Sequence, residues 1–503
     1  MTGHVIVRRL GQLPFATALC LVALPNLAFL TTHLASPILA VACVACTAAG
    51  VAWTVRTFLR HSVSLDIPLL LVALIASFAL SCLGGQAHLF YANDDWLIRD
   101  AVLRDLVAEP WPVGYRYLGD ATILRAALGL YLMPAVFGKM LGLRIAHAAM
   151  LTQNTLLFGC LFYVFAQSFT PRRVALWILA IFVAFGGWDI VGTWLLGKPL
   201  TFGGHLEHWM PGQQFTSHVT QVFWVPNHAA SGWAFAAAYL LWHRKHLDAG
   251  GLICVFGLCA FWSPLSMIGA LPFLARAMVV DGMSGRLRFL RLPAPILTAL
   301  GLAPVLLYLL ADGGRVPHGF RTIDQFFIAS YIIFVLLEIG PVLFVLFAAH
   351  RSDPDGQPSV LHGDIPLILA ILLFVPVYRL GATDFVMRAS IPALALLALR
   401  FGEVVTARST SWRRVAAIAI VAIGAGAPIY EIGRALQRPA FAISDCSLLD
   451  VSRVPPNDGP LFHYLARTDR IETSVAGKVL APAVRLMDVE PRLPGWPDRV
   501  TTD

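Results

Sequence analysis

Apolar runs separated by short polar turns follow one another along almost the whole chain. A helix that crosses a bilayer needs about 17 to 25 mainly apolar residues. The runs that reach or approach this length predict an all-α polytopic membrane protein with about 13 transmembrane helices. The expected spans are residues 13–30, 38–55, 67–83, 145–169, 174–196, 229–242, 252–262, 265–279, 292–310, 326–349, 365–378, 385–399 and 415–432.

A further apolar segment, residues 121–141, is broken by Arg125, Pro134 and Lys139. Cytoplasmic loops of membrane proteins are enriched in Lys and Arg. The basic turns fall on one side only if this segment lies in the membrane surface, or re-enters it, without crossing. We therefore expect the N-terminus in the cytoplasm and the C-terminus outside. The basic turns carry Arg8, Arg9, Arg56, Arg60, Arg172, Arg173, Arg286, Arg288, Arg291, Arg408, Arg413 and Arg414.

This topology divides the chain into four parts. Residues 1–86 hold the first three spans, and residues 87–144 form an outer loop with an acidic pair and surface helices. Residues 145–436 form the main transmembrane bundle. Residues 437–503 form an extracytoplasmic tail, which its prolines and mixed charges predict to be a small lid or a loosely ordered cap.

Composition supports a membrane protein and excludes several other classes. The chain of 503 residues is 58% hydrophobic and only 13% charged, which is more apolar surface than a soluble protein buries. The net charge of +8 comes from Lys and Arg at the ends of apolar runs, so it indicates contact with membrane lipids and no nucleic-acid partner. Cys43 and Cys46 form a CxxC without a second ligand pair nearby, so we expect no metal or redox role for them.

The stretch at residues 91–96 places two adjacent carboxylates, Asp94 and Asp95, directly after the third apolar run. Ionisable groups are costly at bilayer depth and collect where water or substrate reaches them. A carboxylate at the membrane surface can act as a general base on an acceptor hydroxyl, or it can ligate a divalent cation that neutralises a leaving phosphate. The alternative is that Asn93 or Asp94 caps the helix that follows.

The helix expected after the acidic pair separates apolar from charged residues. Such a pattern is typical of a helix that lies along a membrane surface. The apolar face carries Ile98, Ala101, Val102 and Leu106, and the charged residues are Arg99, Asp100 and Arg104.

Polar and aromatic residues crowd the expected outer loop at residues 197–227. Aromatic rings stack on the C–H faces of sugars, and amides or imidazoles bond to sugar hydroxyls. An interfacial aromatic belt is the alternative explanation for the rings. The expected substrate-binding residues are His208, Gln213, Trp224, Asn227 and His228.

A pair of histidines in the same loop, His205 and His208, has a spacing that a metal site could use. The sequence offers no clear third ligand, so we expect no metal there.

Charged residues also interrupt the later apolar runs. Arg379 and Arg388 lie near the outer face, and because guanidinium groups pair well with phosphate, both are candidates to hold a lipid-linked phosphate donor. The alternative is an ion pair between Asp384 and Arg388 that locks two helices. Asp189 and Glu338 lie within apolar runs below the outer surface.

An acidic pair in the first large outer loop, a surface helix after it and the turn Ala135-Val136-Phe137-Gly138 resemble the GT-C superfamily of integral-membrane glycosyltransferases. The resemblance implies a bundle of about 11 to 13 helices with juxtamembrane helices in the first outer loop. It also implies sugar transfer from a polyprenyl-phosphate donor. On that basis Asp94 or Asp95 is the catalytic base, and Arg379 or Arg388 holds the donor phosphate.

The sequence therefore predicts an inverting glycosyltransferase in a bacterial-type cytoplasmic membrane, with its active site facing outside. The expected partners are a polyprenyl-phosphate-linked sugar and a glycan or lipid acceptor of the cell envelope. A transporter or flippase of lipid-linked glycans is the alternative, with Asp189, Glu338 and Arg388 along a pathway. No internal repeat of the kind common in transporters is evident in the sequence. An assembly subunit without chemistry is a third interpretation.

Overall fold

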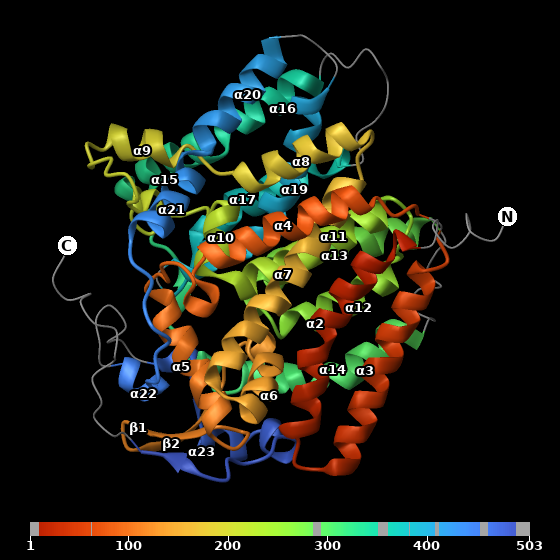
Figure 1. The fold of residues 1–503 in the computed structure, drawn as a ribbon, viewed down its shortest axis with the longest axis vertical. Helices are drawn as coiled ribbons and strands as arrows, with labels where there is room; N and C mark the ends of the chain where they lie inside the picture. Colours follow the sequence, from red (N-terminus) through yellow and green to blue (C-terminus); the bar gives the residue numbers. More distant parts are fainter. Residues whose placement is uncertain are drawn as a thin grey trace.

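The computed structural model describes residues 10–61, 63–284, 293–350, 361–381, 383–407, 412–452 and 461–488. Several basic residues on which the predicted topology depends therefore lie outside the described residues, namely Arg8, Arg9, Arg286, Arg288, Arg291 and Arg408. Helices dominate the fold (Figure 1). The bundle contains α2 (Leu13–Thr32), α3 (Pro37–Phe58), α4 (Ile67–Leu83), α7 (Leu143–Gln167), α8 (Arg172–Ala184), α9 (Asp189–Leu195), α10 (His218–Trp224), α11 (Pro226–His243), α12 (Ala249–Ala260), α13 (Pro264–Met283), α14 (Pro293–Leu310), α15 (Gln325–Glu338), α16 (Gly340–His350), α17 (Ile365–Phe374), α18 (Asp384–Ala389), α19 (Ile391–Thr406), α20 (Trp412–Gly424) and α21 (Gly426–Gln437).

The helical architecture confirms an all-α membrane protein. Within the described residues, seven helical segments are long and apolar enough to cross a bilayer, or eight if the bent pair α15–α16 counts as one span. Several expected spans form shorter helices, such as the 12-residue α12. The larger number of about 13 crossings stays a prediction.

Close helix packing depends on small residues, as the pair α3 and α14 illustrates. The two helices run side by side in Figure 1. A Cβ atom on Gly301 of α14 would overlap the Oγ1 of Thr47, and one on Gly50 of α3 would overlap the Oγ1 of Thr298. Glycine at both positions therefore lets the two backbones approach closely.

Turns of the chain alternate between two ends of the bundle. At one end, Arg172 Nε lies 2.6 Å from Asp66 Oδ2, and the rings of His61 and His246 lie 5.1 Å apart. At the other end, Ala35 N donates to Val479 O over 3.0 Å, which ties the first hairpin to the tail. We call this second end the sheet end.

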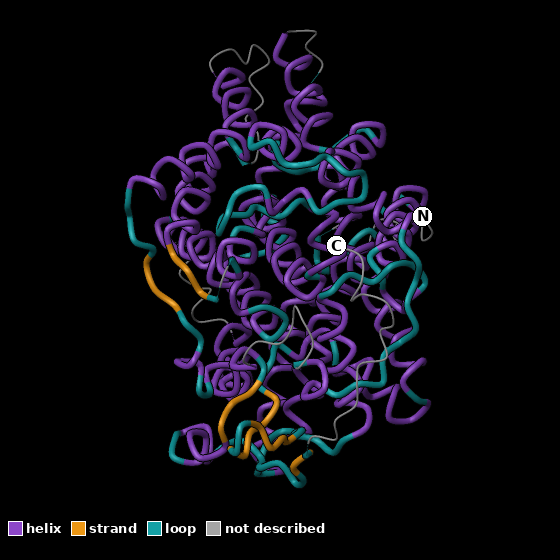
Figure 2. Tube along the Cα trace, turned by 90° about the vertical axis from the view of Figure 1, so that its left-hand side faces the viewer, coloured by secondary structure: helices purple, strands orange, loops and turns teal. Residues whose placement is uncertain are grey.

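A four-stranded sheet marks the sheet end, at the bottom of Figures 1 and 2. Its strand order is β5-β2-β1-β6, in which two strands come from the outer loop and two from the tail. The described part of the tail is thus an ordered cap built onto the loop. The elements here are the 3-10 helix η1 (Gln86–His88), α5 (Asp95–Ala108), β1 (Gly114–Tyr117), β2 (Asp120–Leu124), α6 (Leu132–Leu141), α22 (Leu448–Val451), β5 (Leu465–Arg467), α23 (Thr468–Glu472) and β6 (Leu486–Met487).

The apolar segment at 121–141 does not form a spanning helix. Its first residues belong to strand β2, and α6 has only 10 residues, about 15 Å of helix, which is half a bilayer core. Gly142, with φ of 93°, ends α6, and α7 begins at the next residue. The segment therefore starts and finishes at the sheet end, as the charge pattern predicted.

Helix α5 is more deeply buried in the protein than its charged face predicted, and its position along the membrane surface stays a prediction. Nine of its 14 residues are buried, including Arg99, Asp100 and Asp105. Asp105 Oδ2 accepts hydrogen bonds from Tyr115 Oη and from Leu448 N, both at 2.9 Å. The charged face of the helix is covered because residues distant in sequence supply partners for its carboxylates.

Candidate functional site

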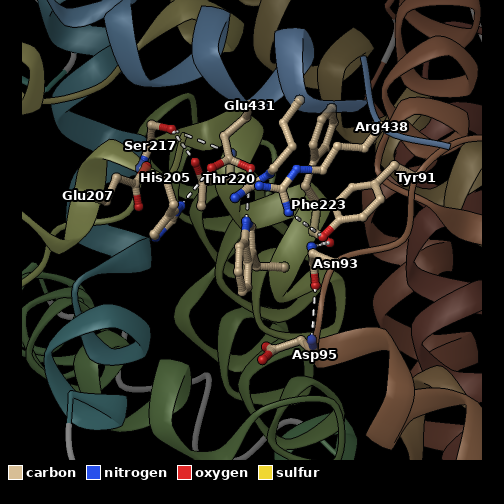
Figure 3. A network of polar contacts seen from close by, with 12 residues as sticks. Tyr91, Asn93, Asp95, His205, Glu207, Ser217, Thr220, Phe223, Glu431 and Arg438 are labelled. Carbon is tan, nitrogen blue, oxygen red and sulfur yellow. Dashed lines mark hydrogen bonds and ion pairs between the residues drawn. The ribbon is translucent and has the colours of Figure 1, made fainter. Parts of the chain in front are cut away.

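Asn93 organises the acidic stretch at the start of α5. Its Oδ1 accepts a hydrogen bond from Asp95 N at 3.1 Å, and its Nδ2 donates to Phe223 O at 2.8 Å (Figure 3). Trp96 Nε1 donates to the same carbonyl at 3.0 Å. Across the described part of the chain, Asp94 makes no capping bond with its side chain. The capping role therefore falls to Asn93, which leaves the carboxylate of Asp95 for other contacts.

The carboxylate of Asp95 pairs loosely with a buried guanidinium one helical turn away. Arg99 Nη2 lies 3.4 Å from Asp95 Oδ2, while Nη1 donates to the Asp95 carbonyl at 3.0 Å. The Arg99 side chain is 7% exposed and that of Asp95 is 39% exposed. Asp95 thus remains accessible, with a positive charge held at its side.

A second ion pair lies on α18. Arg388 Nη2 lies 2.9 Å from Asp384 Oδ1, as expected for residues four apart on a helix. The turn before α18 contains Gly381 with φ of 64°, where a Cβ atom would lie 2.6 Å from Asp384 Oδ2 and 3.3 Å from His463 Cε1. This turn therefore lies against both the ion pair and the tail.

Two tail residues, His463 and Tyr464, follow each other near the ion pair on α18, where a Cβ atom on Gly381 would lie 3.3 Å from His463 Cε1. Burial raises the pKa of the Tyr464 phenol, and charged groups from α5 and α18 act on the same phenol. The guanidinium groups lower its pKa and the carboxylates raise it; they belong to Arg99, Asp95, Arg388 and Asp384. Burial lowers the pKa of the adjacent His463, with Asp384 opposing this and Arg388 adding to it. We name these six residues the Tyr464 cluster.

The sequence pattern did not identify His463 and Tyr464. They lie in a tail whose mixed composition indicated only a cap. The only indication of a functional site in that segment was a pair of adjacent residues whose side chains can donate or accept protons, His463 and Tyr464.

Arg379 lines a pocket of about 270 Å³ together with a second arginine, Arg321. Strand β4 (Tyr378–Leu380) pairs with β3 (His318–Phe320), and Arg321 N donates to Val377 O at 2.9 Å, which sets the two arginines on neighbouring strands. Burial lowers the pKa of Arg321, and the charge of Arg379 lowers it further. We call this space the two-arginine pocket.

The lining of the two-arginine pocket combines polar groups with an exposed apolar rim. Gln213 Nε2 donates to Ser330 Oγ at 3.1 Å, and Asp324 Oδ1 caps α15 by accepting from Phe327 N at 2.7 Å. Phe320 is 71% exposed and Phe326 is 73% exposed. Two positive charges beside exposed rings suit an anion that carries a hydrocarbon chain.

Trp224 and His205 both contact the buried carboxylate of Glu431. Figure 3 labels Glu431 and His205 in this network. Glu431 Oε2 accepts from Trp224 Nε1 at 2.9 Å, and Oε1 lies 2.6 Å from His205 Nδ1. Arg434 pairs with Glu431 and lies 4.9 Å from the Trp224 ring centroid. Burial lowers the pKa of His205, but Glu431 outweighs it and the net pKa is raised. Trp224 is thus enclosed by protein groups instead of standing open as a sugar platform.

The other predicted substrate residues occupy two environments. His208 is exposed as a residue, but its ring packs against that of His205 at 4.4 Å between centroids; desolvation of the ring, followed by the charge of His205, lowers the pKa of His208 to about 4. Asn227 and His228 are buried at the start of α11, where Asn227 Nδ2 donates to Trp262 O at 3.2 Å and His228 Nδ1 lies 2.6 Å from Ser263 Oγ.

The predicted site residues therefore lie in several surroundings. Asp94 directly precedes α5, and Asp95 and Arg388 belong to the Tyr464 cluster. Arg379 and Gln213 line the two-arginine pocket, Asn227 and His228 begin α11, and His208 lies beside His205. Trp224 belongs to the Glu431 network. Among the described residues, three side chains able to hold a metal converge at His88, Asp100 and His147, and not at His205 and His208.

Comparisons with protein-family models, with curated proteins and with solved structures found no match to this chain. The case for a function therefore depends on the geometry of these sites.

Proposed function

We propose that the chain is a membrane glycosyltransferase of the GT-C type that moves a sugar from a polyprenyl-phosphate donor to a cell-envelope acceptor. The observation that carries the proposal is the two-arginine pocket with its apolar rim, together with the accessible Asp95 of the Tyr464 cluster. Residues 379–384 connect Arg379 to Asp384 of the same cluster. The five Cα–Cα steps between them span at most about 18 Å when fully extended, and the turn at Gly381 shortens that distance.

The donor phosphate would lie between Arg321 and Arg379, with its isoprenoid chain along Phe320 and Phe326. Paired guanidinium groups bind a phosphate through short, charge-assisted hydrogen bonds. They would also stabilise the negative charge that the polyprenyl phosphate gains as it leaves. Exposed rings at this edge of the protein suit contact with the lipid chain.

The acceptor hydroxyl would meet the donor at the Tyr464 cluster. Asp95 removes the hydroxyl proton while the acceptor oxygen bonds to the anomeric carbon and the bond from that carbon to the phosphate oxygen breaks. A single displacement of this kind inverts the anomeric centre. Arg99 holds the carboxylate of Asp95 in place, and the Arg388–Asp384 pair holds the neighbouring wall.

The test is to replace Asp95 and Asp94 singly by Asn in the native host and to measure the glycan product. We expect Asp95→Asn to abolish the product and Asp94→Asn to keep most of it. Full product with both variants would remove the acidic pair from catalysis.

Donor binding is tested separately with Arg379→Gln and Arg321→Gln. Arg470→Gln is the matched control, because Arg470 is exposed on α23. The proposal requires that the two pocket variants, and not the control, weaken binding of a polyprenyl phosphate to the purified protein.

A flippase of lipid-linked glycans is the second candidate, and buried carboxyl groups in the bundle favour it. Glu338 is 5% exposed and accepts a hydrogen bond from Trp209 Nε1 at 2.8 Å, and Asp189 is fully buried. Reconstitution in vesicles separates the two functions: a flippase moves labelled lipid-linked sugar across the bilayer without an acceptor, whereas the transferase needs one.

A further inference from the structure

Three buried side chains that can bind metal converge behind α5, and the sequence pattern did not single out any of them as a metal ligand. His88 lies in η1, Asp100 on α5 and His147 on α7. One ligand atom from each lies within 4.8 Å of the other two. Their exposed fractions are 8%, 1% and 0%, so the group is closed to bulk water.

The His88 ring is oriented as a metal ligand requires. Its Nδ1 lies 3.1 Å from the carbonyl oxygen of Phe441, which can only accept, so Nδ1 carries the hydrogen. The opposite nitrogen, Nε2, lies 2.7 Å from Asp100 Oδ2. Metal-binding histidines commonly donate their second N–H to a backbone carbonyl, which fixes the ring and leaves the other nitrogen for the ion. The ring reaches this position because Ala87 and His88 both adopt the left-handed backbone region, with φ of 57° and 56°.

His147 supplies the second, independent observation. Neither of its ring nitrogens has a hydrogen-bond partner among the described residues, although the side chain is fully buried. Its ring stands nearly perpendicular to that of His88, at 80° and 5.4 Å between centroids. Buried polar groups are normally satisfied, because leaving one without a partner costs free energy. A metal ion between the two rings and Asp100 would satisfy His147.

We propose that His88, Asp100 and His147 bind a divalent transition-metal ion of the Zn²⁺ class. Imidazole nitrogen and carboxylate oxygen are ordinary zinc ligands, and tetrahedral bonds of about 2.0 to 2.1 Å put ligand atoms about 3.3 Å apart. That separation lies between the 2.7 Å of the closest pair and the 4.8 Å limit of the group. Small shifts of the side chains would therefore bring these three ligand atoms to the separation that zinc ligands have.

The ion would join three segments that the chain brings together only in the folded state. It ties the loop after α4 to α5 and to α7, and that loop leads directly to Asn93. Because the ligands are closed to water, we assign the ion to positioning of the acidic stretch and not to contact with substrate. The site does not depend on the proposed transferase activity.

The first test is the metal content of the full chain purified in detergent, measured by elemental mass spectrometry. We expect about one equivalent of zinc in the native protein, and we expect His147→Gln to lose it. His33→Gln is the matched control, since His33 is a buried histidine of the same end that stacks on Phe29 at 4.6 Å, and it should keep the metal.

A second measurement uses mainly the native protein, so its result does not depend on whether a variant folds. The native protein is treated with a chelator and refilled with Co²⁺, whose visible absorption reports tetrahedral nitrogen and oxygen ligands. We expect the bands to appear, and we expect the chelator to lower the unfolding temperature of the native protein but not that of His147→Gln. A native protein with no bound metal, no Co²⁺ bands and no response to chelator would overturn the proposal and leave His88 and Asp100 as a simple ion pair. Metal retained at full stoichiometry by His147→Gln would also overturn it.

Discussion

Asn93 and Asp95 should respond to substitution in opposite ways, because the first supports the structure and the second is proposed to support the chemistry. Asn93→Ala removes the acceptor of Asp95 N and the donor to Phe223 O. Loss of a helix cap costs about 1 kcal/mol, and loss of a buried neutral hydrogen bond costs about 1 kcal/mol more. Phe223 O keeps its hydrogen bond from Trp96, so no buried carbonyl is left without a partner. The free energy of unfolding should therefore fall by about 2 kcal/mol in total.

Asp95→Asn should change stability far less. Its bond to Arg99 is 3.4 Å long and its side chain is 39% exposed, and exposed ion pairs contribute about 0 to 1 kcal/mol. Thermal unfolding of both purified variants in the same detergent, followed by tryptophan fluorescence, measures the difference. The glycan product in the native host measures activity.

Asn93→Ala should therefore unfold at a lower temperature but retain activity below that temperature, while Asp95→Asn unfolds like the native protein and is inactive. Asn93→Asp is a second comparison, since it keeps the accepting Oδ1 but puts a carboxylate oxygen against Phe223 O at a buried position; it should also unfold at a lower temperature and stay active. The reasoning fails if Asp95→Asn is the less stable variant or if Asn93→Ala alone abolishes the product.

Three further predictions concern the rest of the sheet end and the bundle. Arg379→Gln and Arg321→Gln should each weaken polyprenyl-phosphate binding at least about tenfold, since a charge-assisted hydrogen bond contributes about 1.5 to 3 kcal/mol; equal affinity in a titration of the purified variants would contradict this. Burial raises the pKa of Asp105 from 3.8 to about 6, so the folded chain holds this proton more tightly than the unfolded chain. The contribution, about 3 kcal/mol in total, is fully present well below pH 4 and is lost as the pH rises through about 6, with about 2 kcal/mol of the loss falling between pH 4 and pH 6; Asp105→Asn should remove that component from the pH dependence of the unfolding temperature. Gly301→Val should destabilise the α3–α14 contact by at least about 1 to 3 kcal/mol, because its side chain would overlap Thr47; an unchanged unfolding temperature would show that the helices can separate freely.

Local patterns in the sequence predicted the helical bundle and the folding back of residues 121–141. The lengths of the apolar runs predicted most of the helices. Arg125 and Lys139 indicated that residues 121–141 do not form a membrane-spanning helix. In the structure Arg125 Nη2 donates to Phe462 O at 2.8 Å, and Lys139 Nζ lies 5.1 Å from the Trp111 ring centroid. Both charges thus have partners at the sheet end.

Partners distant in sequence could not be predicted, and they account for the errors. The charged face of α5 suggested solvent exposure because the sequence does not show the partners of its carboxylates. The partner of Asp100 is His88, which follows the preceding helix α4, and a partner of Asp105 is Leu448 of the tail. The pairing of Arg379 with Arg321 depends on the register of β3 and β4, two strands of three residues each. Such short strands carry no periodic signal.

A density map of the purified protein with bound polyprenyl phosphate tests the proposed donor site most directly. We expect phosphate density between the guanidinium groups of Arg321 and Arg379, with the isoprenoid chain along Phe320 and Phe326. We also expect the free face of the phosphate to point toward Asp95. Phosphate density at the opposite end of the bundle, near Arg172, or in a passage that crosses the bundle past Glu338, would refute this donor site.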